Sequence, residues 1–470
     1  MTDEELKQRA SEFVEKNWED VVADIDSLVR INSVEDLDHA EPGKPYGPAP
    51  FEALDTAVKI AARLGLDAHN CDGHIGYADV PGASPKQIAT IGHTDIVPAG
   101  TGWTFEPFRV TRKDGYLIGR GVLDDKGPTT LSLYAAKFFT DLARETGERL
   151  PYTLRCIIGN NEETEMADVE WYLDNFDQPE FLFSPDADFP LIYGEKGGWS
   201  ATVTSKPVSD VIVDFQGGTV GNAVAGEATA VVRADASKLP SADRIDVESA
   251  GEGLARLTAH GIGAHASMPQ GSINAIGLLV DYLLQNDLCS AGEKDFLQFE
   301  RLVFGSTDGS TLGIACQDEY FDPLTCIGGT IATKDGHFEQ TLDSRYPTNI
   351  TGEEITRRVG ALAAEHGCTI HVDLDMVPFL TDPDTPAMQT LVRTYNEYTG
   401  RDAKGFCIGG GTYARHFKAG GSFGPNDPAF PMPDWVGAEH SADEGFSEEQ
   451  LKRALQIYIV SIARLMRLEL

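Results

Sequence analysis

The first 65 residues carry a hydrophobic pattern with helical spacing. Thr2 and Glu5 are placed as a capping box, and apolar residues then recur every three to four positions from Phe13 to Val29. A second stretch of this kind, "FEALDTAVKIAARLG", covers residues 51–65 and ends on glycine, a residue type that favours helix termination. We therefore predict two amphipathic helices at the start of the chain.

The next part of the chain alternates short apolar runs with longer helical patterns. The runs expected to form strands are "QIATI" (87–91), "YTLRCIIG" (152–159) and "EFLF" (180–183), and helices are expected near residues 127–146 and 165–174. Strands and helices that alternate in this way are typical of a mostly parallel sheet with helices on both faces. Polar residues follow each run, which predicts a functional site at the carboxyl ends of the strands.

The pattern changes after residue 195. From there to about residue 384, short alternating runs such as "ATAVVRADAS" predict antiparallel strands, with a helix within residues 272–286. The chain then returns to helices and glycine-rich loops and closes on the amphipathic helix "SEEQLKRALQIYIVSIARLMRLEL". We predict an α/β protein with a three-layer domain formed by residues 1–195 and 385–470, and an inserted α+β domain at 196–384. The segment 290–325 has no pattern that we can interpret.

Composition limits the partners of the chain. The 74 acidic and 38 basic residues give a net charge of −36 at pH 7, and such a surface repels nucleic acid and anionic lipid headgroups. The N-terminus shows no secretory signal, and no stretch reaches the roughly 18 apolar residues that span a bilayer. The seven cysteines include no Cys-x-x-Cys pair, which argues against a disulfide framework and a cysteine zinc site. We expect a cytoplasmic protein without nucleic-acid or membrane partners.

Histidines and acidic residues gather at the predicted strand ends. They are His93 and Asp95, Asp124 and Asp125, Glu162 and Glu163, Asp186 and Asp188, and His440 near the end of the chain. Taken singly, each has an ordinary interpretation as a solvated strand end, a helix start, an acidic turn or a surface histidine. Taken together, two histidines and several carboxylates without cysteine suit a pair of zinc or manganese ions. Two ions bridged by a carboxylate, about 3.5–4 Å apart, can polarise one carbonyl and one water.

Seven stretches carry a resemblance to a known family. They are "GHTDIVPAG", "GRGVLDDKGP", "NNEETE", "SPDADFPLIYGEKG", "GIGAHASMPQ", "SRYP" and "IGGGTYAR", and they span nearly the whole chain. The sequence resembles the dinuclear zinc hydrolases that include aminoacylase, succinyl-diaminopimelate desuccinylase, carnosinase and carboxypeptidase G, and most closely their dipeptidase V type. The resemblance implies that the three-layer domain is catalytic, that the inserted domain is an enlarged lid, and that the protein is a metal-dependent dipeptidase of unblocked dipeptides.

The resemblance also implies a metal centre of two divalent ions, zinc first, with manganese or cobalt as alternatives. The implied ligands are His93 and Asp186 for one ion, Glu163 and His440 for the other, and Asp124 as the bridge. The peptide bond between Asp124 and Asp125 is often cis in this family.

Further residues are assigned to catalysis and substrate binding by the same resemblance. Glu162 is expected to be the general base, Asp95 to orient the imidazole of His93, and His265 to stabilise the oxyanion. The residues expected to hold the substrate carboxylate are Asn222, Arg345 and the loop residues Gly410, Gly411 and Thr412. The alternative for His265 is an ordinary core histidine, and the alternative for the glycines is a flexible loop. Phosphate binding is disfavoured, because no lysine follows the glycines as it does in a phosphate-binding loop.

One residue departs from the family pattern, and two other functions are compatible with the ligand set. In "HSADEGF", Asp443 stands where relatives carry asparagine, which puts the surroundings of His440 in question. The same metal pair would also serve an N-acyl amino acid deacylase, and an inactive binding protein is a remoter alternative that the intact base and ligands argue against. The expected partner is a small peptide, and we expect a monomer, with a homodimer as the alternative.

Overall fold

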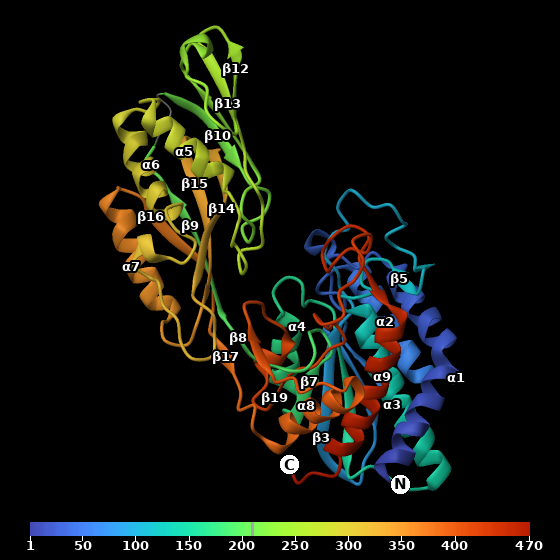
Figure 1. Ribbon diagram of the computed structural model, residues 1–470. Helices are drawn as coiled ribbons and strands as arrows, with labels where there is room; N and C mark the ends of the chain where they lie inside the picture. The colour runs from blue at the N-terminus through green and yellow to red at the C-terminus, as the bar shows by residue number, and fades with distance from the viewer. Residues whose placement is uncertain (208–210) are drawn as a thin grey trace. The chain divides into compact units, whose positions relative to one another are not determined.

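The computed structural model describes residues 1–207 and 211–470, and these form two compact units. Unit 1 comprises Met1–Gly194, Leu380–Phe406 and Gly411–Leu470, and unit 2 comprises Glu195–Phe379 and Cys407–Gly410. Unit 2 is therefore inserted into a discontinuous unit 1 (Figure 1).

Unit 1 is built on a mixed sheet, whose nine described strands run in the order β1-β2-β6-β3-β7-β19-β8-β17, with β18 paired to β8. Their bounds are β1 (Asp67–Cys71), β2 (Ile75–Val80), β3 (Ser84–His93), β6 (Tyr152–Gly159), β7 (Phe181–Ser184), β8 (Ile192–Glu195), β17 (Phe379–Leu380), β18 (Phe406–Ile408) and β19 (Gly420–Ser422). The central strands β6, β3, β7 and β19 are parallel, whereas β1 and β2 on one side and β8 on the other pair antiparallel. The predicted parallel strands thus form the centre of the sheet, and antiparallel strands extend it. A small separate sheet consists of β4 (Thr111–Lys113), β5 (Tyr116–Ile118) and β20 (Gly445–Ser447).

Helices cover both faces of the large sheet, as the sequence predicted. One face carries α1 (Asp3–Val29), α2 (Pro48–Arg63), α3 (Lys126–Thr146), α8 (Pro386–Thr399) and α9 (Glu448–Leu465), and the other carries α4 (Ala167–Asn175) and the short 3-10 helix η4 (Tyr413–His416). Successive strand residues point to opposite faces of the sheet. Ile88 therefore packs in the core that α1, α3 and α9 cover, and Ala89 packs in the core that α4 and η4 cover. The capping box of Thr2 and Glu5 is present at the start of α1. A further 3-10 helix, η1, covers Leu37–His39.

Unit 2 is an antiparallel sheet with helices on one face. Its described strands run in the order β12-β13-β11-β10-β14-β15-β9-β16. Their bounds are β9 (Gly197–Thr204), β10 (Ile212–Gly217), β11 (Glu227–Val232), β12 (Ile245–Gly251), β13 (Leu254–His260), β14 (Thr325–Lys334), β15 (His337–Tyr346) and β16 (Thr369–Met376). The helices are α5 (Ala275–Gln285), α6 (Ala291–Val303) and α7 (Gly352–Glu365), with 3-10 turns η2 (Ala236–Lys238) and η3 (Ser310–Leu312) (Figure 1). The α+β composition predicted for the insert is confirmed.

The segment 290–325, which the sequence pattern left without an interpretation, contains α6 and η3. Helix α6 begins with a capping box in which Ser290 and Glu293 bond each other's backbone N–H groups. The seven cysteines are all free thiols. In the described part of the chain, no helix combines the length and the apolar character needed to cross a membrane.

Candidate metal centre

Three parallel strands of unit 1 end at the same edge of the sheet, and each brings polar side chains there. Strand β3 ends on His93, β6 is followed by Glu162 and Glu163, and β7 is followed by Asp186. Because β6, β3 and β7 are parallel neighbours, their carboxyl ends meet, and these side chains converge. Asp124 arrives at the same place from the loop ahead of α3, and its peptide bond to the following aspartate is cis.

Asp124 lies between two histidines. Its Oδ1 atom is 3.1 Å from Nε2 of His93, and its Oδ2 atom is 2.8 Å from Nε2 of His440. The same Nε2 atom of His440 is 3.1 Å from Oε2 of Glu163. The two oxygens of one carboxylate therefore contact two separate imidazoles, which is the arrangement that a bridging ligand requires.

Two further carboxylates approach His93. Oδ2 of Asp186 is 3.6 Å and Oε2 of Glu162 is 4.0 Å from its Nε2 atom. Potential ligand atoms form two groups, His93 with Asp124 and Glu163, and His93 with Glu162 and Asp186, within which all atoms lie within 4.8 Å of one another. The structure thus brings together in unit 1 the five residues that the resemblance assigns as ligands and the residue that it assigns as the base.

Asp95 lies on the other side of the His93 ring. Nδ1 of His93 is 3.1 Å from the backbone oxygen of Asp95 and 3.3 Å from its Oδ1 atom, and both residues are buried. These acceptors require a proton on Nδ1, so Nε2 is the nitrogen that faces Asp124. The Oδ2 atom of Asp95 accepts the backbone N–H of Glu163 at 3.0 Å, which also fixes the start of that side chain.

The cluster holds more negative charge than its own cations balance. Burial, with a contribution from Asp186, raises the pKa of Glu162 well above its usual value, and burial raises the pKa of Glu163 to about 7. Burial acts against protonation of His440, but its hydrogen bonds to Asp124 and Glu163 raise its pKa to about 11. A bound cation is favoured at this place because it would compensate the excess of buried negative charge.

The donor set fits a pair of divalent ions. It consists of imidazole nitrogens and carboxylate oxygens without a thiolate, the combination that zinc, manganese and cobalt accept. One carboxylate already faces both histidines, so two ions can share it. The residues present are therefore suitable ligands for a dinuclear centre.

Sequence reasoning missed a buried ion pair beneath the Asp124 loop. Oε1 of Glu444 accepts the backbone N–H groups of Gly121 at 2.9 Å, Leu123 at 3.1 Å and Asp124 at 3.3 Å. The other oxygen of Glu444 pairs with Arg120, and both side chains are almost completely buried. The loop that carries Asp124 is thereby tied to the segment that carries His440. The position of Glu444 four residues after His440 was the only signal in the sequence.

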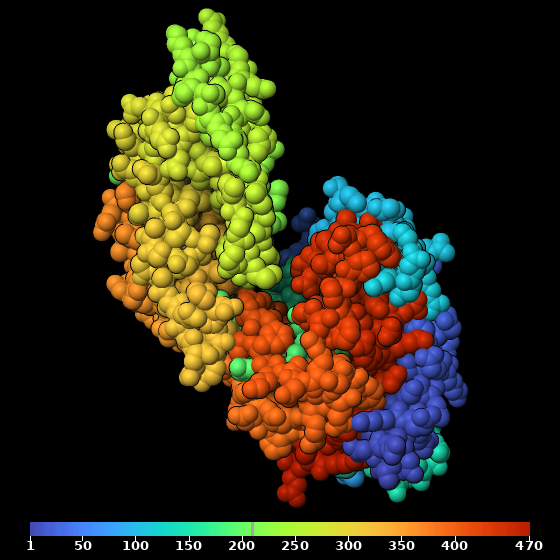
Figure 2. All heavy atoms as spheres, viewed as in Figure 1, coloured from blue at the N-terminus to red at the C-terminus, as the bar shows by residue number. Residues whose placement is uncertain are grey.

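The structure explains the departure at Asp443. Its Oδ1 atom accepts the backbone N–H groups of Thr104 at 2.7 Å and Phe105 at 3.0 Å. Its φ angle of 58° is left-handed, a conformation that asparagine and aspartate adopt more readily than other side chains. Because the contact needs a single acceptor oxygen, the side chain of either aspartate or asparagine can make it. Figure 2 shows the two segments side by side on the surface of unit 1, residues near 105 in cyan and those near 435 in red.

The side chains predicted in unit 2 come from neighbouring segments on one face of its sheet. The backbone oxygen of Asn222 accepts the N–H of Ala266, directly after His265, at 2.9 Å. Ala266 packs with Ile327, which pairs across the sheet with Asp343. The guanidinium of Arg345, two residues further on β15, donates to the carboxylate of Asp343 through Nε at 3.0 Å and Nη2 at 3.1 Å.

His265 has a defined proton arrangement. Its Nδ1 atom accepts the backbone N–H of Ser267 at 3.2 Å and lies 2.7 Å from the hydroxyl of that residue. A backbone N–H can only donate, so the ring proton of neutral His265 is on Nε2. The exposed side chain is therefore a donor through Nε2.

The predicted glycine loop is divided between the units. Gly410 belongs to unit 2, whereas Gly411 and Thr412 belong to unit 1. The hydroxyl of Thr412 caps η4 by accepting the N–H of Ala414 at 3.1 Å and is 2.8 Å from the hydroxyl of Ser422. This hydroxyl is thus engaged within unit 1.

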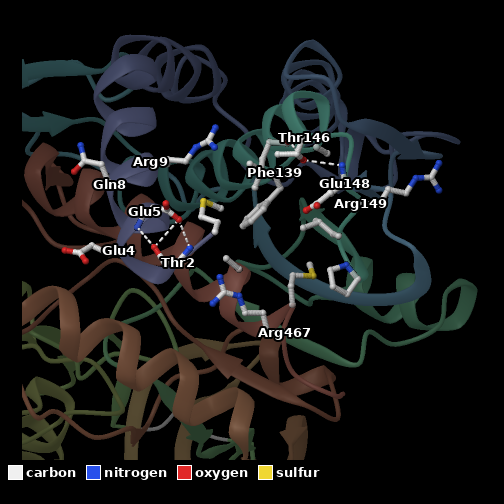
Figure 3. Close-up of a pocket in the computed structure, with 17 residues that line it drawn as sticks. Thr2, Glu4, Glu5, Gln8, Arg9, Phe139, Thr146, Glu148, Arg149 and Arg467 are labelled. Atoms are coloured by element: carbon white, nitrogen blue, oxygen red, sulfur yellow. Dashed lines mark hydrogen bonds between the residues drawn. The ribbon is translucent and has the colours of Figure 1, made fainter.

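A surface cavity of about 1110 Å³ lies at the opposite end of unit 1 (Figure 3). The start of α1, the end of α3 and the end of α9 line it, with Phe139 in its wall and Arg9 and Arg467 at its edge. Asp124 lies two residues before the start of α3, whose 21 residues extend about 30 Å at 1.5 Å each. The cavity is therefore remote from the metal centre.

Comparison with known proteins identifies relatives over the full length of the chain. The model of "Peptidase family M20/M25/M40" matches residues 89–464. The chain is 34% identical over 466 residues to "Putative dipeptidase YtjP" of Bacillus subtilis, covering 95% of this chain and 97% of that protein. It is 29% identical over 475 residues to "Beta-Ala-Xaa dipeptidase" of Lactobacillus delbrueckii subsp. lactis, covering 97% of each.

Solved structures share the fold at low sequence identity. Human carnosine dipeptidase 1 matches with a TM-score of 0.60 and 14% identity over 98% of this chain and 99% of that one. The dipeptidase Dug1p of Saccharomyces cerevisiae matches with a TM-score of 0.63 and 12% identity over the whole of both chains. The family resemblance read from the sequence motifs is confirmed by the match of the family model over most of the chain. With the candidate ligands His93 to His440 inside the matched residues, this chain belongs to peptidase family M20/M25/M40.

Proposed function

We propose that this protein is a metal-dependent dipeptidase that hydrolyses the peptide bond of unblocked dipeptides. The observation that carries the proposal is the carboxylate of Asp124, whose oxygens lie 3.1 Å and 2.8 Å from the imidazoles of His93 and His440, with Glu162 close by. Relatives whose names describe dipeptidases cover nearly the whole chain. Family membership supports peptide hydrolysis, and the names of the relatives support the dipeptide as substrate.

The proposed reaction assigns the proton transfers to Glu162. Two divalent ions, when bound by His93, Asp124, Glu163, Asp186 and His440, supply a polarised scissile carbonyl and a more acidic water. Glu162 accepts a proton from the water as its oxygen attacks the carbonyl carbon, and returns it to the amide nitrogen as the C–N bond breaks. The position of Glu162 suits this role because its Oε2 atom lies 4.0 Å from Nε2 of His93, beside the residues that would hold the ions. Asp95 holds the His93 ring through Nδ1 during these steps.

We assign substrate recognition to unit 2, the inserted domain that we propose as the lid. The Nε2 proton of His265 is proposed to stabilise the oxyanion, and the fork of Arg345, with Asn222 and the loop at Gly410 and Gly411, to hold the substrate carboxylate. Asp343 already occupies two donors of Arg345, so the remaining guanidinium hydrogens are those offered to the substrate. We further propose zinc as the native ion, a monomeric state and a cytoplasmic location.

The experiment compares two substrate classes on one preparation. The protein is stripped of metal and reloaded with zinc or manganese, and hydrolysis of alanyl-alanine is compared with hydrolysis of N-acetylalanine. We expect cleavage of the free dipeptide alone. Cleavage of the N-acetyl compound alone would reassign the same centre to deacylation. If the metal-loaded protein hydrolysed neither compound, the proposed function would be overturned and a binding protein would be favoured.

A further inference from the structure

Tyr413 and Asp168 form a buried pair close to the metal centre, and the mechanism above does not use them. Both side chains are 0% exposed, and the hydroxyl of Tyr413 donates to Oδ2 of Asp168. The ring of Tyr413 stands edge-on to the imidazole of His93, with ring centres 6.3 Å apart and planes at 83°. Tyr413 therefore lies against one candidate ligand and is bonded to a carboxylate from α4.

Asp168 in turn holds the backbone that leads to Glu162. Its Oδ2 atom accepts the N–H groups of Asn160 at 2.8 Å and Asn161 at 3.1 Å. The residue after Glu162 has a different anchor, because the N–H of Glu163 bonds Asp95. The short segment that bears the proposed base is thus fixed by Asp168 on one side and by Asp95 on the other.

The close approach of Tyr413 to this strand supports a specific role for its hydroxyl. A Cβ atom placed on Gly159, the last residue of β6, would lie 2.2 Å from the hydroxyl oxygen of Tyr413. Only glycine leaves room for that oxygen, so the strand end and the tyrosine are matched in shape. The hydroxyl reaches Asp168 across the backbone immediately before Asn160.

We propose that Tyr413, acting through Asp168, is a positioning residue that sets the backbone of Asn160 and Asn161 and thereby the placement of the base Glu162. This inference rests on the proposed function of Glu162. Loss of the hydroxyl leaves Asp95 in place on Glu163, so the ligand stays anchored. Asp168, the other support of this segment, loses the hydrogen bond that holds its carboxylate in place. A small displacement of a general base lowers turnover strongly, because proton transfer requires hydrogen-bond distance.

The test compares Tyr413→Phe with a matched variant. Tyr134→Phe removes the hydroxyl of another fully buried tyrosine, which donates to Oδ2 of the buried Asp24 at 2.7 Å in the contact of α3 with α1. Both variants lose one tyrosine–aspartate hydrogen bond, so we expect similar decreases in thermal midpoint and two bound zinc ions per chain in each. Only Tyr413→Phe is expected to lower kcat, by about ten-fold, with KM within two-fold of wild type.

Amide hydrogen exchange supplies a readout that does not depend on activity. We expect the amides of Asn160 and Asn161 to exchange at least ten-fold faster in Tyr413→Phe than in wild type, with no change at these amides in Tyr134→Phe. Unchanged exchange at both amides would overturn the inference even if no substrate were cleaved, whereas failure of wild type to cleave dipeptides concerns the proposed function alone.

Two kinetic outcomes would also overturn the inference. One is a kcat within two-fold of wild type in Tyr413→Phe, and the other is an equal loss in Tyr134→Phe. Asp168→Ala removes the acceptor of the same hydrogen bond. If Tyr413 acts through Asp168, adding Tyr413→Phe to Asp168→Ala should not lower kcat further, and multiplied losses would count against the inference.

Discussion

Glu300 is a carboxyl group enclosed in the apolar core of unit 2, and its replacement by glutamine should make stability less dependent on pH. The side chain is 0% exposed on α6, on the buried side of the helix that also carries Phe296 and Val303. Within residues 1–207 and 211–470, neither of its oxygens has a hydrogen-bond partner. Burial raises the pKa of Glu300 well above its ordinary value of 4.5.

The sign of the effect follows from proton binding. Above pH 4.5 the unfolded chain releases the Glu300 proton, whereas the folded protein keeps it up to the raised pKa. The folded state then binds one proton more, so the free energy of unfolding falls by about 1.4 kcal/mol for each pH unit in this window. This loss accumulates from pH 4.5 upward for as long as the pH stays below the raised pKa of Glu300. Glu300→Gln has no such loss because an amide does not ionise.

Urea unfolding of wild type and Glu300→Gln at pH 6.0, 6.5 and 7.0 tests this reasoning. We expect the stability advantage of the variant to grow by about 1.4 kcal/mol over that unit. Glu293→Gln is the matched control on the same helix, because Glu293 is buried but accepts backbone N–H groups of Val211 and Ser290. That variant should be less stable than wild type at every pH. A pH-independent difference for Glu300→Gln would refute the reasoning, since it would mean that Glu300 is ionised in the folded protein.

Four other outcomes are expected at the metal centre and on the surface. Glu162→Ala should keep its metal content and lose at least about 100-fold in kcat, and a loss of only a few-fold would remove Glu162 as the base. Removal of metal by a chelator should lower the thermal midpoint measured by calorimetry, since a ligand at about 1,000 times its Kd stabilises the folded state by about 4 kcal/mol. Addition of zinc or manganese should restore the midpoint. An unchanged midpoint would contradict the dinuclear site. Asp443→Asn should match wild type in stability and turnover. Asp443→Ala should lose about 1–3 kcal/mol of unfolding free energy, because two N–H groups lose their acceptor. Equal stability of the two variants would argue against this contact. With a net charge of −36, the thermal midpoint should rise between 0.1 M and 1 M KCl as the screening length falls from about 10 Å to about 3 Å, and a flat response would show that surface repulsion is unimportant.

Most of the fold could be predicted from the sequence, because its helices and strands have regular hydrophobic periods. The strand at 152–159 was predicted with the bounds that the structure shows, and the helix at Lys126–Thr146 to within one residue. Strand β19 was not predicted, because Gly420–Ser422 has three small residues and no apolar period. Its place in the sheet is decided by pairing with β7 and β8, which sequence pattern does not encode.

Residues of the candidate site could be predicted from the sequence where they follow the ends of strands or lie in family motifs. Asp343 could have been anticipated as the partner of Arg345, because residues two apart on a strand share a face. Glu444 could not, since its partners are backbone N–H groups 323 positions away at Gly121 and neighbouring residues. Contacts of side chains with distant backbone depend on tertiary structure and leave no periodic trace in the sequence.

The place of β19 has a consequence for synthesis on the ribosome. It lies between β7 and β8 in the sheet, yet it is made after the long contiguous segment of unit 2 (Glu195–Phe379). A nascent chain therefore holds two strand edges unpaired until residue 422 has emerged, and unpaired edges are open to wrong partners and to surveillance by chaperones. His440 emerges from the ribosome later than β19. A product terminated before residue 420 therefore lacks both the strand that closes its sheet and the last imidazole of the candidate metal centre.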